Sequence, residues 1–312
     1  MGMPSYKIGL YSTYFRTDKE SDTYTHKSLT NALADMGHKH RVMVPAKFSF
    51  HVSSNTTRVL YDSKELDIDG LIIRGTHGAR IPTSLLTNCL WYQNIPTIDR
   101  RQAFSGQYMT KFGALLRRYC ELRDYVPGTF LMYSRESACS HYKTGAFDRP
   151  MIRKPIQGTR GVGVKVIRTR AEIKDFIENY DFSEPLMLQE YIENTREFRS
   201  ILVGDKCLGI VKKIPNPEGL GNFAQGAQFI RADKEYEEII RNISLNIGAK
   251  SPYDILGIDI LLDKNSRIYI IEANRNPQYR GFELACPGID VGKHIVELMI
   301  QRIIKSGRKP AG

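Results

Sequence analysis

The sequence predicts an α/β domain followed by a larger α+β region, and two observations support this fold class. In the first hundred residues, short apolar runs alternate with helical patterns, as in sheets covered by helices. After that, apolar segments come in pairs joined by short turns that contain Gly, Asp or Asn, which is typical of antiparallel hairpins. At 312 residues the chain is long enough for about two domains.

In the N-terminal region, strands and helices alternate. Gly37 ends the first helical pattern and Pro82 lies at the start of the second, as is common at helix boundaries. The glycines of this region do not form GxGxxG, so a dinucleotide site is not indicated. The expected elements are strands at 6–11, 41–44 and 69–74 and helices at 26–36 and 81–93.

The rest of the chain is expected to combine antiparallel hairpins with helices. One hairpin turns at Gly204-Asp205 and another at residues 263–265. The expected strands are 129–133, 151–154, 164–167, 186–191, 197–203, 207–213, 255–262 and 267–273. The expected helices are 102–124, 135–143, 171–180, 233–248 and 291–305.

Composition and charge exclude several classes of protein. No stretch approaches the roughly 18 consecutive apolar residues of a membrane helix, and the N-terminus has no apolar run of signal-peptide length. The five cysteines form no CxxC pair, which argues against a disulfide framework or a zinc site. We therefore expect a cytoplasmic protein with free thiols. The net charge of +11 favours acidic partners, without choosing among nucleotides, acidic peptides and nucleic acid.

A glycine-rich loop at residues 158–163 lies between two predicted strands. Its three glycines let backbone N–H groups approach an anion closely, and Thr159 adds a hydroxyl. The loop lacks the GxxxxGK[ST] pattern of a Walker A phosphate loop. Phosphate binding and an ordinary hairpin turn both fit this segment when it is taken alone.

Two carboxylates and an amide are predicted to meet on neighbouring strands. Glu272 and Asn274 share a face because they are two residues apart in a strand, and the turn at 263–265 can bring Asp259 beside them. Burying these groups unpaired would be costly, whereas Mg²⁺ prefers such oxygen ligands. The pattern indicates either a magnesium site or a salt-bridged or solvent-facing hairpin end.

A charged segment follows the apolar strand at 186–191. It begins with Gln189-Glu190-Tyr191-Ile192 and continues to Glu197-Phe198-Arg199. Such a segment is a candidate hinge between subdomains. A strand end with surface charge explains it as well.

The ordered set of these segments resembles the ATP-grasp ligases, and most closely the RimK-type glutamate ligases, which add amino acids to a carboxylate. The resemblance covers residues 70–305, and the first 70 residues fit the family's N-terminal domain more loosely. The segments that carry the resemblance are 153–164, 189–192, 197–199, Asn222, 257–260, 272–274 and 288–293.

The resemblance implies an α/β N-terminal domain and an ATP-grasp fold, whose two subdomains clasp ATP between antiparallel sheets. It implies a pre-ATP-grasp domain at 1–105 and a central subdomain with a phosphate lid at 106–188. A C-terminal subdomain with the metal site would span 189–312.

The resemblance also implies positions for ATP. Lys111 and Lys154 match two phosphate-contacting lysines, and loop 158–163 looks like a mobile lid over the phosphates. Residues 189–192 would hold adenine through backbone groups, and Glu197 would accept hydrogen bonds from the ribose. The implied ATP-binding residues are Lys111, Lys154, Gly158, Thr159, Arg160, Gly161, Gly163, Gln189, Glu190, Tyr191, Ile192 and Glu197.

The same resemblance implies a metal site and a reaction. Asp259, Glu272 and Asn274 would bind two Mg²⁺ ions, or Mn²⁺ in their place, between the β- and γ-phosphates. ATP would convert a carboxylate to an acyl phosphate, and an attacking amine would then displace phosphate to give an amide. The candidate catalytic residues are Arg199 and Lys213, which would stabilise the developing oxyanion, and Asn222, which matches a polar position in the site. Both cations also fit ordinary surface roles.

Two segments depart from the family pattern. Residues 275–280 (RNPQYR) replace a stretch of small residues with Pro-Gly, at the place where substrate should lie. Arg275 and Arg280 are therefore predicted to bind an acidic or carboxylate-bearing substrate, although a solvated structural role fits them equally. Lys212-Lys213 stands where the family favours arginines, and lysine cannot make the same bidentate contact.

The expected protein is an ATP-dependent carboxylate–amine ligase that joins an amino acid to a peptide, a protein or a small carboxylate. Its expected partners are the amine, the carboxylate acceptor, such as an acidic peptide or protein, and further copies of the chain, but no membrane. One alternative is a non-catalytic ATP-binding regulatory module, against which the two lysines and three metal positions argue. Another is a ligase acting on a nucleic-acid-associated substrate, although no nucleic-acid motif is present.

Overall fold

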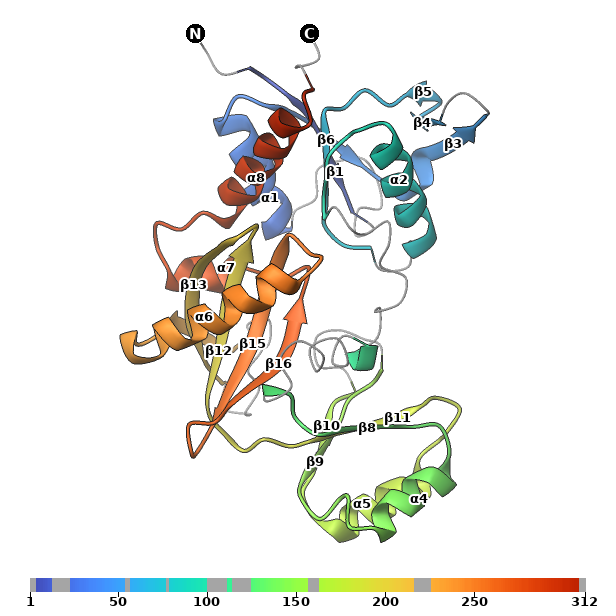
Figure 1. Ribbon diagram of the computed structural model, residues 1–312, viewed down its shortest axis with the longest axis vertical. Helices are drawn as coiled ribbons and strands as arrows, with labels where there is room; N and C mark the ends of the chain where they lie inside the picture. The colour runs from blue at the N-terminus through green and yellow to red at the C-terminus, as the bar shows by residue number, and fades with distance from the viewer. Residues whose placement is uncertain are drawn as a thin grey trace.

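The computed structural model describes residues 4–12, 23–53, 57–76, 79–99, 111–113, 125–156, 163–215 and 226–308. Its larger sheets follow one another along the long axis of the molecule, with the N-terminal sheet at the top of the view and the sheet built from residues 129–190 at the bottom (Figure 1). Among the described residues, no helix is both long enough and apolar enough to span a membrane.

The N-terminal sheet is parallel and has helices on both faces. Its elements are β1 (Lys7–Tyr11), β2 (Lys39–Met43), β6 (Gly70–Ile73), β7 (Thr97–Ile98), α1 (Tyr24–Asp35), α2 (Arg80–Tyr92) and α8 (Val291–Lys305). The strand order is β2-β1-β6-β7. Because side chains alternate along a strand, Leu71 and Ile73 pack with α2, whereas Ile72 packs in the cluster that contains α1 and α8. Helices α1 and α8 lie side by side (Figure 1).

A second, small sheet of three strands stands beside this domain. It contains β3 (Phe48–Val52), β4 (Thr57–Tyr61) and β5 (Lys64–Glu65), and it follows the short 3-10 helix η1 (Pro45–Lys47). The sequence analysis did not predict it, because its strands are short and mix apolar with polar residues. The other unpredicted elements are β7, β14 (Gln228–Arg231) and α7 (Arg280–Ala285).

The middle of the chain forms an antiparallel sheet with its own core. Its elements are β8 (Thr129–Met132), β9 (Met151–Arg153), β10 (Lys165–Ile167), β11 (Leu186–Glu190), α4 (Arg135–Lys143) and α5 (Arg170–Asn179). Both helices begin at a hydroxyl cap, since Ser134 accepts from the N–H of Ser137 and Thr169 from that of Glu172. The strands order as β10-β9-β11-β8, so the predicted glycine-rich loop connects an antiparallel pair.

The largest sheet has five antiparallel strands in the order β14-β13-β12-β15-β16. Its other elements are β12 (Asn194–Val203), β13 (Lys206–Ile214), β15 (Ile255–Asp263), β16 (Ile268–Asn274) and α6 (Lys234–Lys250). Helix α6 covers one face, where Phe198, Ile258 and Ile260 are buried. On the other face, Ile201 and Val211 join the core formed with α7 and α8.

The expected hairpins at Gly204 and at residues 263–265 are present as β12–β13 and β15–β16. Gly204 has a φ of 62°, a left-handed conformation that glycine adopts without strain. The expected helix at 102–124 lies outside the described residues except for 111–113. Helix α8, the last helix of the chain, packs on α1 and β6 of the N-terminal sheet and on β12 of the large sheet.

Candidate active site

Polar side chains gather on the face of the five-stranded sheet that α6 does not cover. Arg199 of β12 lies opposite Asp259 of β15, and Asp259 lies opposite Glu272 of β16. Opposed residues share a face, as do residues two apart in a strand. The register therefore puts six predicted site residues on one face: Glu197, Arg199, Lys213, Asp259, Glu272 and Asn274.

Asp259 is buried between two cations. Arg199 contacts it with two hydrogen bonds, from Nε to Oδ1 and from Nη2 to Oδ2, both at 2.7 Å. The Nζ of Lys213 lies 2.9 Å from Oδ1 of the same carboxylate. Burial alone would raise the pKa of Asp259, but the charges of Arg199 and Lys213 outweigh it and hold that pKa below the usual range. The carboxylate therefore stays ionised.

Lys213 also binds Glu197, its cross-strand neighbour, with Nζ donating to Oε1 at 2.5 Å. This lysine is only 5% exposed, so its charge is compensated inside the protein by two carboxylates. Burial would lower the pKa of the Arg199 guanidinium, but Asp259, followed by Glu272 and Glu197, raises it, so Arg199 remains charged. Both predicted oxyanion-stabilising cations thus lie at the predicted metal-binding carboxylate.

Glu272 and Asn274 complete the oxygen donors on this face. Glu272 is exposed, and the half-buried Asn274 accepts a hydrogen bond at Oδ1 from the backbone N–H of Asn276 at 2.9 Å. No group of three His, Cys, Asp or Glu side chains that could hold a metal ion occurs in the described part of the chain. A metal here would need the Asn274 amide beside the carboxylates of Asp259 and Glu272, a donor set that fits Mg²⁺.

One predicted phosphate-binding lysine, Lys154, follows β9 of the middle sheet. Its Nζ donates to Oε1 of Gln189 at 2.7 Å, and Nε2 of Gln189 donates to Oγ1 of Thr129 at 2.8 Å. Gln189 is buried, so this chain of hydrogen bonds fixes the lysine against the sheet.

The second predicted lysine, Lys111, lies near the carboxylates of the large sheet. Its backbone N–H donates to the carbonyl of Ile156 at 3.0 Å. Burial lowers the pKa of Lys111, the negative charge of Glu272 opposes this, and the positive charge of Arg153 adds to it. Lys111 is therefore within electrostatic reach of Glu272, although Lys111 lies in a helical segment and Glu272 in the large sheet.

The candidate hinge follows β11 and is anchored by its backbone. The N–H of Glu190 donates to the carbonyl of Gly128 at 2.8 Å, and that of Tyr191 donates to the carbonyl of Pro150 at 2.9 Å. These two groups are therefore already used within the protein. Ile192, the last residue of the predicted adenine-binding segment, is buried.

Of the predicted lid, Gly163 lies within the described residues. It has a φ of 74°, and its carbonyl accepts a hydrogen bond from Nη1 of Arg153 at 2.5 Å. The other predicted residues that lie outside the described part of the chain are Gly158, Thr159, Arg160, Gly161 and Asn222.

The two predicted substrate arginines occupy different surroundings. Arg275 is half-buried, and its Nη2 donates to Oγ1 of Thr76 at 2.8 Å, which connects the end of β16 to the N-terminal domain. Arg280 is exposed, with its guanidinium carbon 5.8 Å from the ring centre of Tyr24. Arg275 thus connects the loop that follows Asn274 to the N-terminal domain.

Three buried residues at this contact were not predicted. Arg74 and Thr76 follow β6, and Asp99 follows β7, so all three lie at the carboxyl ends of neighbouring parallel strands. Nη2 of Arg74 donates to the carbonyl of Pro277 at 3.1 Å. Ligands of open α/β sheets bind at this edge, and that rule could have singled these residues out from the sequence.

Comparison with known proteins identifies the family to which this chain belongs. Residues 121–299, more than half of the chain, match the model described as the RimK-like ATP-grasp domain. The probable alpha-L-glutamate ligase 1 of Shewanella frigidimarina is 28% identical in an alignment that covers 94% of this chain and 97% of that protein. The glutamate–LysW ligase ArgX of Sulfurisphaera tokodaii is 30% identical over 190 residues, 58% of this chain and 64% of that protein.

Solved structures confirm the expected fold class. The ATP-grasp ligase PsnB complexed with a minimal precursor superposes with a TM-score of 0.71 at 16% identity, covering 96% of this chain and 99% of that one. A RimK domain ATP-grasp protein from Sphaerobacter thermophilus gives 0.64 at 16% identity, covering 94% and 99%. At these identities the likeness establishes the ATP-grasp fold alone.

Proposed function

This chain belongs to the RimK-like ATP-grasp family of carboxylate–amine ligases, and we propose that the polar face of β12, β13, β15 and β16 is its active site. The single observation that carries the proposal is the buried contact of Arg199 and Lys213 with Asp259, beside the exposed carboxylate of Glu272. Ordinary surface charge would not be buried and doubly bonded in this way.

In this proposal the chain supplies charge at fixed positions. Arg199 and Lys213 are held in place by their contacts with Asp259, so they would stabilise negative charge on the acyl phosphate and on the oxyanion formed when the amine attacks it. Lys111 and Lys154 would contact the phosphates of ATP. Because the side chains of Arg199, Lys213 and Lys154 are each bonded within the protein, little reorganisation of them is needed at the moment of reaction.

Asp259, Glu272 and Asn274 would hold two Mg²⁺ ions, which would supply positive charge to offset that of the phosphates. The metal must share Asp259 with two cations, so Glu272 and Asn274 would contribute the more accessible oxygens. The backbone N–H groups of Glu190 and Tyr191 already donate to the carbonyls of Gly128 and Pro150. Adenine would therefore bind other backbone groups of the hinge. The carboxylate of Glu197 would accept hydrogen bonds both from Lys213 and from the ribose hydroxyls.

We propose an amino acid as amine substrate and a peptide or protein as carboxylate acceptor. The similar ArgX is named a glutamate–LysW ligase, and PsnB was solved with a precursor peptide. The net charge of +11 favours an acidic acceptor.

ADP release from Mg·ATP tests this function. The wild-type protein is incubated with a panel of amino acids and acidic peptides, with and without an added amine. Glu272→Gln serves as the inactive reference, and Glu65→Gln, an exposed β5 residue paired with Arg58, is the matched control. We expect ADP release that requires one carboxylate–amine pair, survives in Glu65→Gln and falls at least about 100-fold in Glu272→Gln.

Release without any amine, or equal release in both variants, would contradict the proposal. ATP binding without turnover on any pair would instead favour the non-catalytic module. A steep dependence of nucleic-acid binding on salt would favour a nucleic-acid-associated substrate.

A further inference from the structure

Helix α2 turns apolar side chains to solvent. Ile81 is 74% exposed, Leu85 49% and Tyr92 70%. The opposite side of the helix is buried, because Leu86 and Leu90 pack in the core on one face of the parallel sheet. Surface helices normally present charged or polar side chains to water. A helix that is apolar on both sides is expected to be covered on both sides.

The exposed face of α2 also lacks charge, since residues 81–92 contain no charged side chain. By contrast, the exposed Ile239 of α6 and Ile304 of α8 each have a charged neighbour in the sequence. Because the chain carries a net charge of +11, two copies repel each other over most of their surfaces. On α2 they can meet without that repulsion.

The exposed residues of α2 form a stripe, which we define as Ile81, Leu85, Asn88 and Tyr92. They are spaced by four, three and four residues, which is the spacing of seams between packed helices. At about 100° per residue, the three apolar members fall within about 40° of one another around the helix. Nδ2 of Asn88 donates to the carbonyl of Ser84 at 2.9 Å, so this amide is already bonded within the helix.

The α2 stripe is symmetric about its own midpoint. If a second copy packs antiparallel across a two-fold axis at that midpoint, Ile81 lies opposite the partner's Tyr92. Leu85 then lies opposite the partner's Asn88, and the two copies of Leu85 are offset by only about 4.5 Å along the helices. A two-fold interface requires a surface that matches itself in this way.

The stripe and its neighbour Trp91 offer enough area for such an interface. Trp91 is exposed beside Tyr92, with the two ring centres 5.0 Å apart. An aromatic side chain buries about 150–250 Å², so with Ile81 and Leu85 each copy presents on the order of 500 Å² of apolar surface. Two copies together reach on the order of 1,000 Å², the lower bound for a specific interface. Monomers rarely expose an apolar patch larger than a few hundred Å².

We propose that α2 is a homodimer interface, in which it packs antiparallel against α2 of a second copy across a two-fold axis. Helix α8, which packs on β12 of the large sheet, covers the other face of the parallel sheet. The interface therefore belongs to the N-terminal domain, and the inference does not depend on the proposed function.

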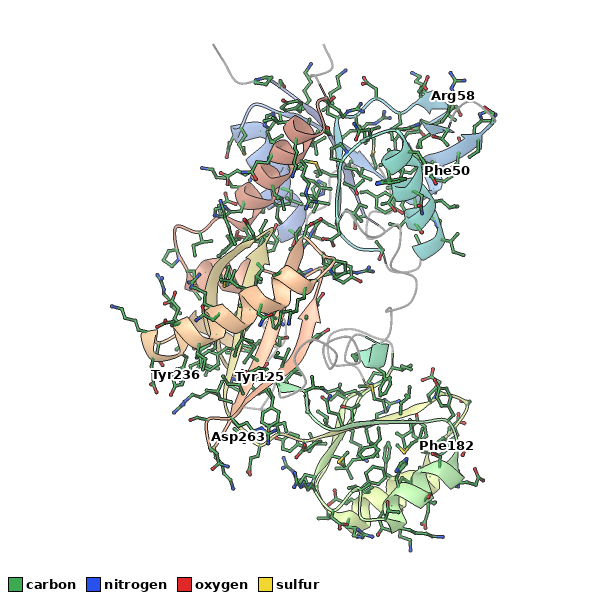
Figure 2. All side chains as sticks on the ribbon, in the orientation of Figure 1. Phe50, Arg58, Tyr125, Phe182, Tyr236 and Asp263 are labelled. Carbon is green, nitrogen blue, oxygen red and sulfur yellow. The ribbon has the colours of Figure 1, made fainter. Side chains whose placement is uncertain are left out.

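Sedimentation velocity of the full chain tests this interface. Two double variants are compared, Leu85→Glu with Asn88→Glu and Leu85→Lys with Asn88→Lys. In the proposed register each variant places like charges opposite one another, whereas an equimolar mixture of the two pairs opposite charges. The control is Ile239→Glu, on α6. Figure 2 shows Tyr236 of that helix far from Phe50, which packs in the core that α2 covers.

We expect the wild type and Ile239→Glu to sediment as dimers at micromolar concentrations. Each double variant should raise the dissociation constant of the dimer at least about 30-fold, and mixing the two should restore dimers, which unfolded variants would not form. Circular dichroism checks the folding of each variant. If a double variant does not fold, Tyr92→Ser, which removes a largely exposed ring, decides by the same measurement.

A wild type that stays monomeric up to its solubility limit would overturn the inference. Dimers that persist in both double variants would overturn it as well, because they would use another surface. A mixture that stays monomeric would refute the antiparallel register. A monomeric wild type that binds vesicles of phosphatidylcholine and phosphatidylglycerol, and loses this binding in the glutamate variant, would instead assign the stripe to a membrane surface.

Discussion

Asp259 illustrates how single residues set the character of this site. A carboxylate that is 6% exposed is stable here only because Arg199 and Lys213 compensate it, and each of those cations in turn depends on it. The sequence predicted that Asp259 would lie beside Glu272, since both belong to one hairpin. It did not predict that both cations would bind Asp259, because Arg199 lies on a strand sixty residues away.

Replacing Asp259 with Asn should destabilise the protein as well as inactivate it. The substitution keeps the shape but leaves two cations with reduced compensation, a change that typically costs about 3 kcal/mol. Urea unfolding followed by circular dichroism measures the change in midpoint. Glu65→Gln, at an exposed ion pair, should leave the midpoint unchanged. Equal midpoints for Asp259→Asn and the wild type would show that the buried pair is energetically neutral.

At the scale of elements, the strand pairings that sequence could predict are the local ones. Hairpins β12–β13 and β15–β16 follow from apolar runs around short turns, and both are present. The pairing of β12 with β15, which completes the site, spans a helix and depends on the whole core. The contact of Thr76 with Arg275 joins segments 199 residues apart, so no local pattern could reveal it.

Gly257 sets how closely the loop after β16 packs on β15. It lies opposite Asn274, and a Cβ added there would be 2.6 Å from Cβ of Pro277, which is too close. Gly257→Ala should therefore push this loop outward, lower the stability by about 1–3 kcal/mol and reduce Mg·ATP turnover.

The matched control is Gly128→Ala, whose added Cβ would meet Glu190 at an ordinary 3.7 Å. We expect its urea midpoint to stay close to that of the wild type. A Gly257→Ala protein as stable and active as this control would show that the loop has room to move.

For the whole molecule, one buried network connects the N-terminal domain to the ligase domain. The side chain of Asp99, which follows β7, accepts a hydrogen bond from the backbone N–H of Asp254, just before β15. Arg302 of α8 contacts both the side chain of Asp254 and the carbonyl of Thr97. The core that contains α8 likewise includes residues of both sheets. The N-terminal domain is thus an integral part of the structure around the site.

This network should make stability depend on pH. Burial, followed by the charge of Asp254, raises the pKa of Asp99 to about 7, against about 3.9 in an unfolded chain. Between these values the native state holds a proton that the unfolded state lacks. The stability that Asp99 contributes is therefore present below pH 4 and is lost as the pH rises through 7.

Asp99→Asn removes this titration and keeps an oxygen that can accept the N–H of Asp254. Urea midpoints of the variant and the wild type should diverge progressively from pH 5 to pH 8, with the wild type losing more stability. Midpoints that stay parallel over this range would show that Asp99 does not titrate in the native protein.

The most direct test of the central claim, that this chain activates a carboxylate with ATP, is an oxygen-transfer measurement. The carboxylate substrate found in the ADP-release assay is labelled with ¹⁸O and converted with Mg·ATP and the amine. Mass spectrometry of the released phosphate then detects any transferred oxygen. The acyl-phosphate route predicts one ¹⁸O atom per phosphate, together with one amide per ADP. Unlabelled phosphate would contradict it.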